Sequence, residues 1–128
     1  MKYIVATTDN TYFRWQILVQ INNFKRLGIL NDLTYVVSVK YKISKELKKI
    51  REATGARILT YRDERKSKKY PSSVASFVMK KHFEKYPEES KMFFYLDPDV
   101  LFTKKPDFPK TYYCSNKWIL SDTKSYID

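Results

Sequence analysis

The chain has 128 residues, of which 43% are hydrophobic, and it carries a formal net charge of +11. This length suits one domain with a sizeable core, and the hydrophobic content excludes an intrinsically disordered chain. The single cysteine, Cys114, excludes an internal disulfide bond and suits a reducing compartment. Because no apolar run is long enough to cross a membrane and no signal peptide is apparent, we expect a cytoplasmic protein without a transmembrane segment.

The excess of basic residues, 25 Lys and Arg against 14 Asp and Glu, favours anionic partners such as nucleotides, nucleic acids or an anionic surface. A second interpretation stays open, because many of the lysines fall on expected helix faces and loops and there serve solubility alone. The charge therefore indicates a class of partner and does not identify one.

The first half of the chain alternates apolar strands with amphipathic helices. Residues 2–8 predict a strand, and residues 11–27 predict a helix that stops at Gly28. A second strand is expected over residues 33–39. Ser44 then caps a helix that ends at Gly55. The positions of that helix expected to face the core are Leu47, Ile50 and Ala53.

The second half continues the alternation. Residues 56–61 predict a third strand, followed by a highly charged loop and a third helix that begins at Pro71 or Ser72 and ends near residue 86. The only histidine, His82, lies on this lysine-rich helix, where we expect it to be half-exposed. A fourth strand is expected over residues 92–96, and residues 112–114 suggest a further one.

Strands that alternate with helices predict an α/β fold with a doubly wound, mostly parallel sheet and helices on both faces. In such sheets, ligands bind at the carboxyl ends of the strands, near a reversal of strand order. Polar clusters follow three of the expected strands, and they are Thr7-Thr8-Asp9, Arg62-Asp63 and Asp97-Pro98-Asp99. Their shared position favours a ligand site at that edge of the sheet.

The acidic pair Asp97 and Asp99 comes directly after the expected fourth strand. Paired carboxylates are typical ligands of hard divalent cations such as Mg²⁺ or Mn²⁺, which also bind phosphate oxygens. The residue types of Asp97-Pro98-Asp99 are also typical of a turn. Both interpretations, a metal site and a solvated turn, fit the tripeptide itself.

At the end of the first strand, Thr7, Asp9 and Tyr12 are candidates for binding a base and a ribose. A carboxylate accepts hydrogen bonds from a base or a hydroxyl, and a tyrosine ring stacks on a base. The alternative is that Asp9 or Asn10 only caps the following helix.

The charged loop after the third strand contains Arg62, the basic residue nearest to a strand end. One interpretation of this loop is a phosphate-binding flap, since arginine pairs well with phosphate oxygens. The other is an ordinary exposed loop.

These features together resemble a nucleotide-sugar-dependent glycosyltransferase of the GT-A fold. The segment Tyr95-Leu96-Asp97-Pro98-Asp99-Val100-Leu101-Phe102 resembles the DxD motif of that fold in its usual frame. The segment from Ile4 to Tyr12 resembles the first strand that holds the nucleoside, and residues 72–77 match a helix that precedes the DxD strand.

The resemblance implies metal-assisted transfer of a sugar from a UDP-sugar to an acceptor, whether glycan, protein or small molecule. Asp99 would coordinate Mn²⁺ or Mg²⁺, and Asp97 would contact the metal or the donor. Ser76 and Arg62 would face the donor sugar or diphosphate, beside the base contacts of Thr7, Asp9 and Tyr12. Because catalytic domains of this fold continue well beyond the DxD strand, we expect residues 1–128 to form a single GT-A-like domain that lacks much of the acceptor-binding part.

Two other functions remain open from the sequence. A nucleic-acid-binding module would explain the charge and the 11 tyrosines, but no RNA- or DNA-binding signature appears, which makes nucleic acid an unfavoured partner. A non-catalytic structural relative of a glycosyltransferase would retain the sheet without the activity.

Overall fold

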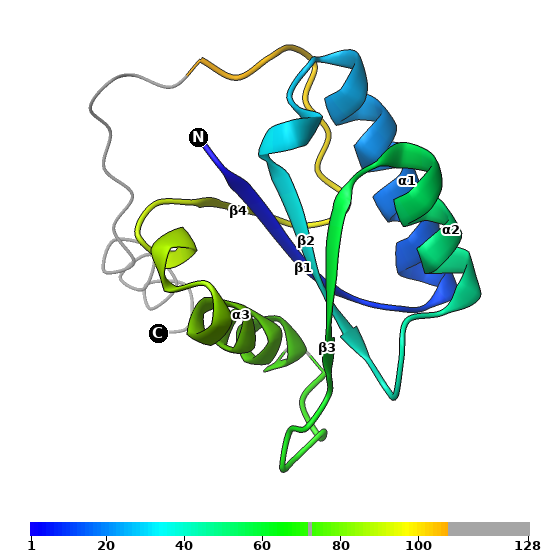
Figure 1. The fold of residues 1–128 in the computed structure, drawn as a ribbon, viewed down its shortest axis with the longest axis vertical. Helices are drawn as coiled ribbons and strands as arrows, with labels where there is room; N and C mark the ends of the chain where they lie inside the picture. The colour runs from blue at the N-terminus through cyan, green and yellow to red at the C-terminus, as the bar shows by residue number, and fades with distance from the viewer. Residues whose placement is uncertain (72, 108–128) are drawn as a thin grey trace, which may run out of the picture.

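Four parallel strands form one sheet with helices on both faces in the computed structural model, which describes residues 1–71 and 73–107 (Figure 1). The strands are β1 (Tyr3–Thr8), β2 (Leu33–Val39), β3 (Arg57–Arg62) and β4 (Phe94–Leu96), in the order β3-β2-β1-β4. The helices are α1 (Thr11–Arg26), α2 (Lys45–Thr54) and α3 (Ser73–Lys85), with the 3₁₀ turns η1 (Leu30–Asp32) and η2 (Pro87–Ser90). The predicted α/β fold with a parallel sheet is confirmed, and it is consistent with a Rossmann-like arrangement.

The residues expected to begin and end the helices do so. Helix α1 begins at Asn10, whose Oδ1 accepts a hydrogen bond from the Phe13 N–H at 2.8 Å. It ends in a Schellman motif, in which Gly28 has a φ of +73° and the Ile29 N–H donates to the Phe24 carbonyl. Helix α2 has the same kind of signals, with Ser44 as its N-cap and a left-handed Gly55 at its C-terminus.

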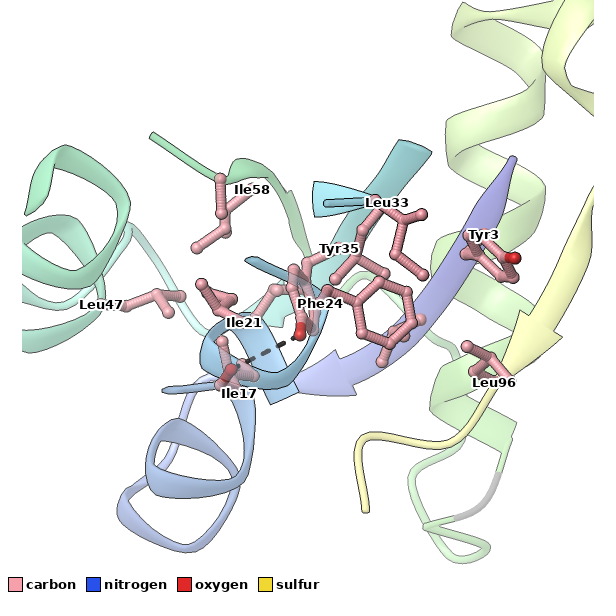
Figure 2. Close-up of a cluster of buried hydrophobic side chains, with 13 residues drawn as sticks. Tyr3, Ile17, Ile21, Phe24, Leu33, Tyr35, Leu47, Ile58 and Leu96 are labelled. Carbon is pink, nitrogen blue, oxygen red and sulfur yellow. Dashed lines mark hydrogen bonds between the residues drawn. The ribbon is translucent and has the colours of Figure 1, made fainter. Parts of the chain in front are cut away.

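The larger core lies between the sheet and helices α1 and α2. Alternate residues of each strand point to this face, as the two-residue period of a strand requires. Figure 2 shows the Tyr35 ring among Ile17, Ile21 and Phe24 of α1 and Leu47 of α2, all of them fully buried. Burying a large apolar side chain contributes about 1.5–3 kcal/mol, so this layer is the main source of stability.

Helix α3 covers the opposite face of the sheet. Ile4 and Ala6 of β1 and Val36 of β2 pack there against Val78, and half-buried side chains of α3 such as Phe83 surround them. Because this core contains fewer fully buried residues than the first, α3 depends more on the polar contacts described below.

The strand order reverses between β1 and β4. The chain passes from β1 through β2 to β3 and then crosses, through α3, to the far side of β1 (Figure 1). The connection from β1 to β2 runs in one direction along the sheet, and the return to β4 runs in the other. The carboxyl ends of β1 and β4 therefore border the crevice in which open α/β sheets bind ligands.

Two expectations about burial were wrong. His82 is fully buried, because it lies on the side of α3 that faces the sheet. Its two ring nitrogens form hydrogen bonds there with Tyr61 and Glu89. Ala53 is exposed, since α2 turns only Leu47 fully into the core. The strand suggested at residues 112–114 lies outside the described residues. Among the residues described, no helix has the length and apolar character needed to span a membrane.

Candidate functional site

Residues Asp97 to Val100 form a tight turn directly after β4. The Val100 N–H donates to the Asp97 carbonyl at 3.2 Å, and Pro98 occupies the second position, where its fixed φ suits a turn. The turn interpretation of the tripeptide is thus confirmed. It does not exclude a site, because both carboxylates remain exposed at the end of a strand.

Helix α1 holds this turn in place through two buried amide side chains. The Gln20 Nε2 donates to the carbonyls of Asp97 at 3.0 Å and Val100 at 2.8 Å. One turn further along α1, the Asn23 side chain bonds both the N–H and the carbonyl of Phe102, each at 2.9 Å. The backbone that carries Asp97 and Asp99 is therefore fixed to a helix packed on the core, which is a rigid support for charge.

An open pocket of about 190 Å³ lies between this turn and the beginning of α1. The residues that line it are Tyr12, Phe13, Gln16, Asp97, Pro98 and Asp99. It sits at the carboxyl end of β4 beside β1, the edge predicted for a ligand. Typical pockets for whole ligands measure about 300–1,000 Å³, so this one suits part of an extended ligand. The structure thus brings together three of the predicted site residues, Tyr12, Asp97 and Asp99.

The two carboxylates have few partners within the described chain. The Tyr95 hydroxyl donates to Asp97 Oδ1 at 3.3 Å, and burial together with the charge of Asp97 raises the pKa of Tyr95 to about 12. Asp99 makes no hydrogen bond with any described residue. No group of three or more potential metal ligands occurs in residues 1–71 and 73–107. The pair therefore fits a divalent cation only if a ligand's phosphate oxygens or water supply the remaining positions.

Asp9 is occupied by partners inside the protein. Its Oδ1 accepts from Arg14 at 2.9 Å and from the Ser44 hydroxyl at 2.8 Å, and its Oδ2 accepts from the Ser44 N–H at 2.7 Å. Its side chain is only 5% exposed. Asp9 thus joins the end of β1 to the beginnings of α1 and α2, a structural role that the sequence did not reveal.

The other predicted residues lie away from the pocket. Thr7 is buried in β1, and its hydroxyl has no hydrogen-bond partner in the described part of the chain. Arg62 ends β3, which is separated from β4 by three strand spacings, or about 14 Å. Ser76 is exposed on α3, which covers the face of the sheet opposite to α1. Of the predicted site residues, Thr7, Asp9, Arg62 and Ser76 therefore do not line the pocket.

Arg62 belongs instead to a basic cluster at the carboxyl ends of β2 and β3. Its guanidinium lies 5.8 Å from the centroid of the Tyr41 ring, and the Lys40 ammonium lies 5.4 Å from the same ring. Tyr41 is 71% exposed. The nearby Asp63 is neutralised by Arg65, whose hydrogen bonds lower the pKa of that carboxyl to about 2. Cations thus dominate this end of the sheet.

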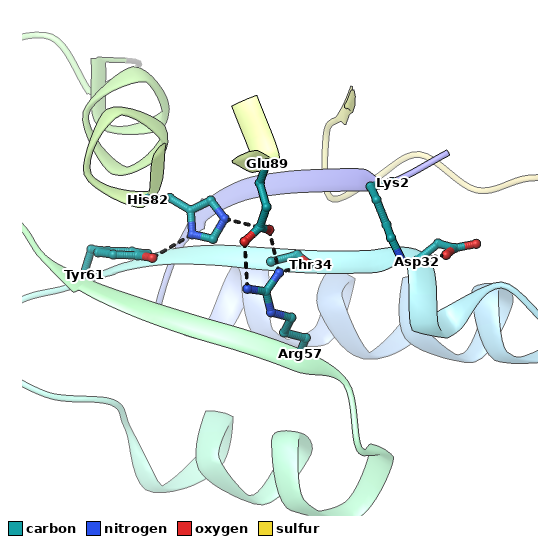
Figure 3. A network of polar contacts seen from close by, with 7 residues as sticks. All are labelled: Lys2, Asp32, Thr34, Arg57, Tyr61, His82 and Glu89. Carbon is teal, nitrogen blue, oxygen red and sulfur yellow. Dashed lines mark hydrogen bonds and ion pairs between the residues drawn. The ribbon is translucent and has the colours of Figure 1, made fainter. Parts of the chain in front are cut away.

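A second polar cluster lies on the α3 face and is paired throughout (Figure 3). His82 Nδ1 lies 2.6 Å from the Tyr61 hydroxyl, and His82 Nε2 lies 3.1 Å from Glu89 Oε1. Both Glu89 oxygens accept from Arg57, at 2.6 and 3.0 Å. Arg57 also donates to Thr34 Oγ1. This chain of contacts ties β3, α3 and η2 together.

Burial lowers the pKa of His82, although its hydrogen bond to Glu89 opposes the shift. The hydrogen bonds from Arg57 lower the pKa of Glu89. A neutral His82 fits the geometry, since Nε2–H donates to the carboxylate and Nδ1 accepts from Tyr61. Because both ring nitrogens of His82 and both oxygens of Glu89 are paired within the protein, this cluster stabilises the fold.

Sequence reasoning missed the polar residues of α1 that face the turn, of which Gln20 and Asn23 bond the segment after β4. Gln16, Gln20 and Asn23 recur at the spacing of one helix face, each directly before a core residue, namely Ile17, Ile21 and Phe24. All three amides are buried. A polar stripe beside an apolar stripe on one helix was the available signal, because buried amides require partners from another segment.

Comparisons of the chain with protein-family models, with curated proteins and with solved structures gave no match.

Proposed function

We propose that the chain binds a nucleoside-diphosphate sugar, with UDP as its nucleotide, together with Mn²⁺ or Mg²⁺, and serves metal-assisted glycosyl transfer. The observation that carries this proposal is the position of Asp97 and Asp99. Both exposed carboxylates line a pocket at the reversal of strand order, beside an exposed Tyr12. The resemblance of this segment to the DxD motif supports the same function.

Asp97 and Asp99 are the residues that would hold the metal. Two carboxylates fill only part of the coordination shell of Mg²⁺ or Mn²⁺, and diphosphate oxygens commonly complete it. A cation bound there supplies Lewis-acid stabilisation of the departing diphosphate. The protein's own contribution is the fixed turn, since Gln20 binds the Asp97 and Val100 carbonyls of its backbone and Asn23 holds the segment that follows.

The proposal predicts strong coupling between metal and nucleotide. Because the protein offers only two carboxylates, Mn²⁺ alone binds weakly and UDP alone meets two negative charges. Each ligand therefore raises the affinity of the other by the same factor. Isothermal titration calorimetry of UDP with and without saturating Mn²⁺ measures this coupling.

The matched variants are Asp97→Asn with Asp99→Asn, and Asp107→Asn alone. Asp107 is an exposed carboxylate that does not line the pocket, so its variant controls for loss of charge. We expect Mn²⁺-dependent binding to vanish in the double variant and to persist in the control. Metal-independent UDP binding, or unchanged binding in the double variant, would reject the proposal.

Nucleic-acid binding is a second candidate, and the basic cluster around Tyr41 favours it. An exposed aromatic ring with two cations beside it resembles the stacking platforms of single-strand-binding proteins. Titration of a fluorescent oligonucleotide at increasing salt tests it, with Tyr41→Leu as the variant. Binding that disappears by physiological salt and does not respond to Tyr41→Leu reports charge alone and removes this candidate.

A further inference from the structure

The three buried amides on the polar stripe of α1 differ in one respect. Gln20 and Asn23 bond the segment after β4, and the oxygen of Gln20 also accepts from the Tyr35 hydroxyl at 2.7 Å. Gln16, one turn before Gln20, forms no side-chain hydrogen bond with any residue in the described ranges. Only 7% of Gln16 is exposed, and it lines the pocket.

Gln16 does not pay the cost of a fully enclosed polar group. Among the described residues, the fully enclosed side-chain atom without a partner is the Thr7 hydroxyl, so the amide of Gln16 reaches solvent through the open pocket. An unpaired amide that faces a pocket is available to a ligand. The neighbours of Gln16 in the pocket are the exposed Tyr12, one turn earlier on α1, and the acidic pair Asp97 and Asp99 across from it.

We infer that Gln16 recognises an uncharged hydrogen-bonding group of the donor nucleotide and helps to determine its specificity. An amide offers one acceptor and two donor hydrogens, and it carries no charge. It therefore suits a neutral group that both donates and accepts, rather than a phosphate. Two parts of a nucleotide have this chemistry, namely the imide edge of a uracil base and a ribose hydroxyl. The inference rests on the proposed function and adds a residue for which the DxD segment gives no indication.

The test compares wild-type protein with Gln16→Met, which keeps the length of the side chain and removes both hydrogen-bonding functions. Calorimetry with Mn²⁺ present uses two probes, UDP and inorganic pyrophosphate. Loss of one uncharged hydrogen bond predicts about a tenfold weaker affinity for UDP in the variant. Pyrophosphate has neither base nor ribose, so its affinity should be the same in both proteins, which also shows that the variant keeps its fold and metal site.

A third probe, UDP methylated at N3 of the base, distinguishes the two sources. If Gln16 contacts the imide edge, the methyl group removes the N3–H donor and leaves only the carbonyl acceptors, so the difference between wild type and variant falls well below tenfold. If Gln16 contacts the ribose, the methylated nucleotide shows the same tenfold difference between the two proteins as UDP.

Two results would overturn the inference while leaving the proposed function intact. One is UDP binding that is unchanged in Gln16→Met, and the other is an equal loss of affinity for UDP and pyrophosphate. If wild-type protein shows no Mn²⁺-dependent binding of UDP, the proposed function fails, and the inference fails with it.

Discussion

Two polar regions of the molecule differ in how their side chains are paired. His82 and Glu89 form hydrogen bonds within the protein through both ring nitrogens and both carboxylate oxygens. The side chains of Gln16 and Asp99 have no hydrogen-bond partner among the described residues. The first region lies on the α3 face, and the second borders the pocket beside α1. The difference separates polar groups with a structural role from polar groups that can bind a ligand. Paired groups hold elements together, and groups left unpaired at the carboxyl edge are available to a ligand.

The largest expected effect comes from Gln20→Met, which tests whether paired polar groups are the ones that stabilise the fold. Gln20 is fully buried, and its loss leaves the carbonyls of Asp97 and Val100 and the Tyr35 hydroxyl short of a partner. We expect a loss of about 3 kcal/mol in the free energy of unfolding, measured by urea denaturation. Gln16→Met, one turn away, is the matched variant and should cost less than about 0.5 kcal/mol. Equal losses in the two variants would mean that both amides are structural.

Removing Glu89 should produce the next largest effect. Glu89→Ala leaves Nε2 of the buried His82 and the guanidinium of Arg57 without their carboxylate. Because Glu89 is partly exposed, we expect a loss of about 2 kcal/mol, below the cost of a fully buried charge. The control is Glu88→Ala, which breaks an exposed ion pair with Lys91 on the same turn and should cost under about 0.5 kcal/mol. Similar values for both variants would contradict the role given to the His82 cluster.

The His82 cluster also predicts a dependence of stability on pH. Burial holds the pKa of His82 below its ordinary value of 6.5, so below that pH the unfolded chain binds a proton that the native protein does not. Stability should therefore fall as the pH drops below about 6.5, by at most about 1.4 kcal/mol per pH unit. The lowered pKa of Glu89 adds a further loss below about pH 4.5.

The chain has a single histidine, which makes this slope easy to assign. Urea denaturation of wild type and His82→Gln between pH 5.5 and 7.5 compares the two slopes. The variant should lose the slope. A slope that persists in His82→Gln, or a wild-type protein that becomes more stable toward pH 5.5, would contradict the account.

The smallest predicted effect concerns Thr7. Its buried hydroxyl has no partner among the described residues, so Thr7→Val should leave stability unchanged or raise it by up to about 1 kcal/mol. Because Thr7 does not line the pocket, the affinity for UDP should be unchanged. A weaker affinity for UDP would restore Thr7 to the nucleotide site, as the sequence first suggested.

The elements of the fold were predictable because their signals are local. Ser44, Gly28 and Gly55 act through their own backbone neighbours, and β2 occupies residues 33–39 as expected. The position of the acidic pair at a strand end was also predictable, because the apolar run directly before it indicates the strand. Tyr12 follows β1 closely enough for the same reasoning.

What the sequence did not reveal depends on contacts between distant segments. Asp9 looked available, and only the folded chain brings Ser44 against it. Arg62 ends a strand as expected, but the strand order puts it at the opposite side of the sheet from Asp97. Gln16 and Gln20 have identical side chains one turn apart, and only the path of the segment after β4 distinguishes them.

The most direct test of the central claim is a crystal structure of the protein grown with Mn²⁺ and UDP, with data collected to record anomalous scattering from manganese. The account predicts a manganese peak in contact with the carboxylates of Asp97 and Asp99 and with the diphosphate, and a nucleoside beside Tyr12 and Gln16. Manganese and nucleotide bound elsewhere, or a nucleotide bound in the pocket without metal at the acidic pair, would contradict it.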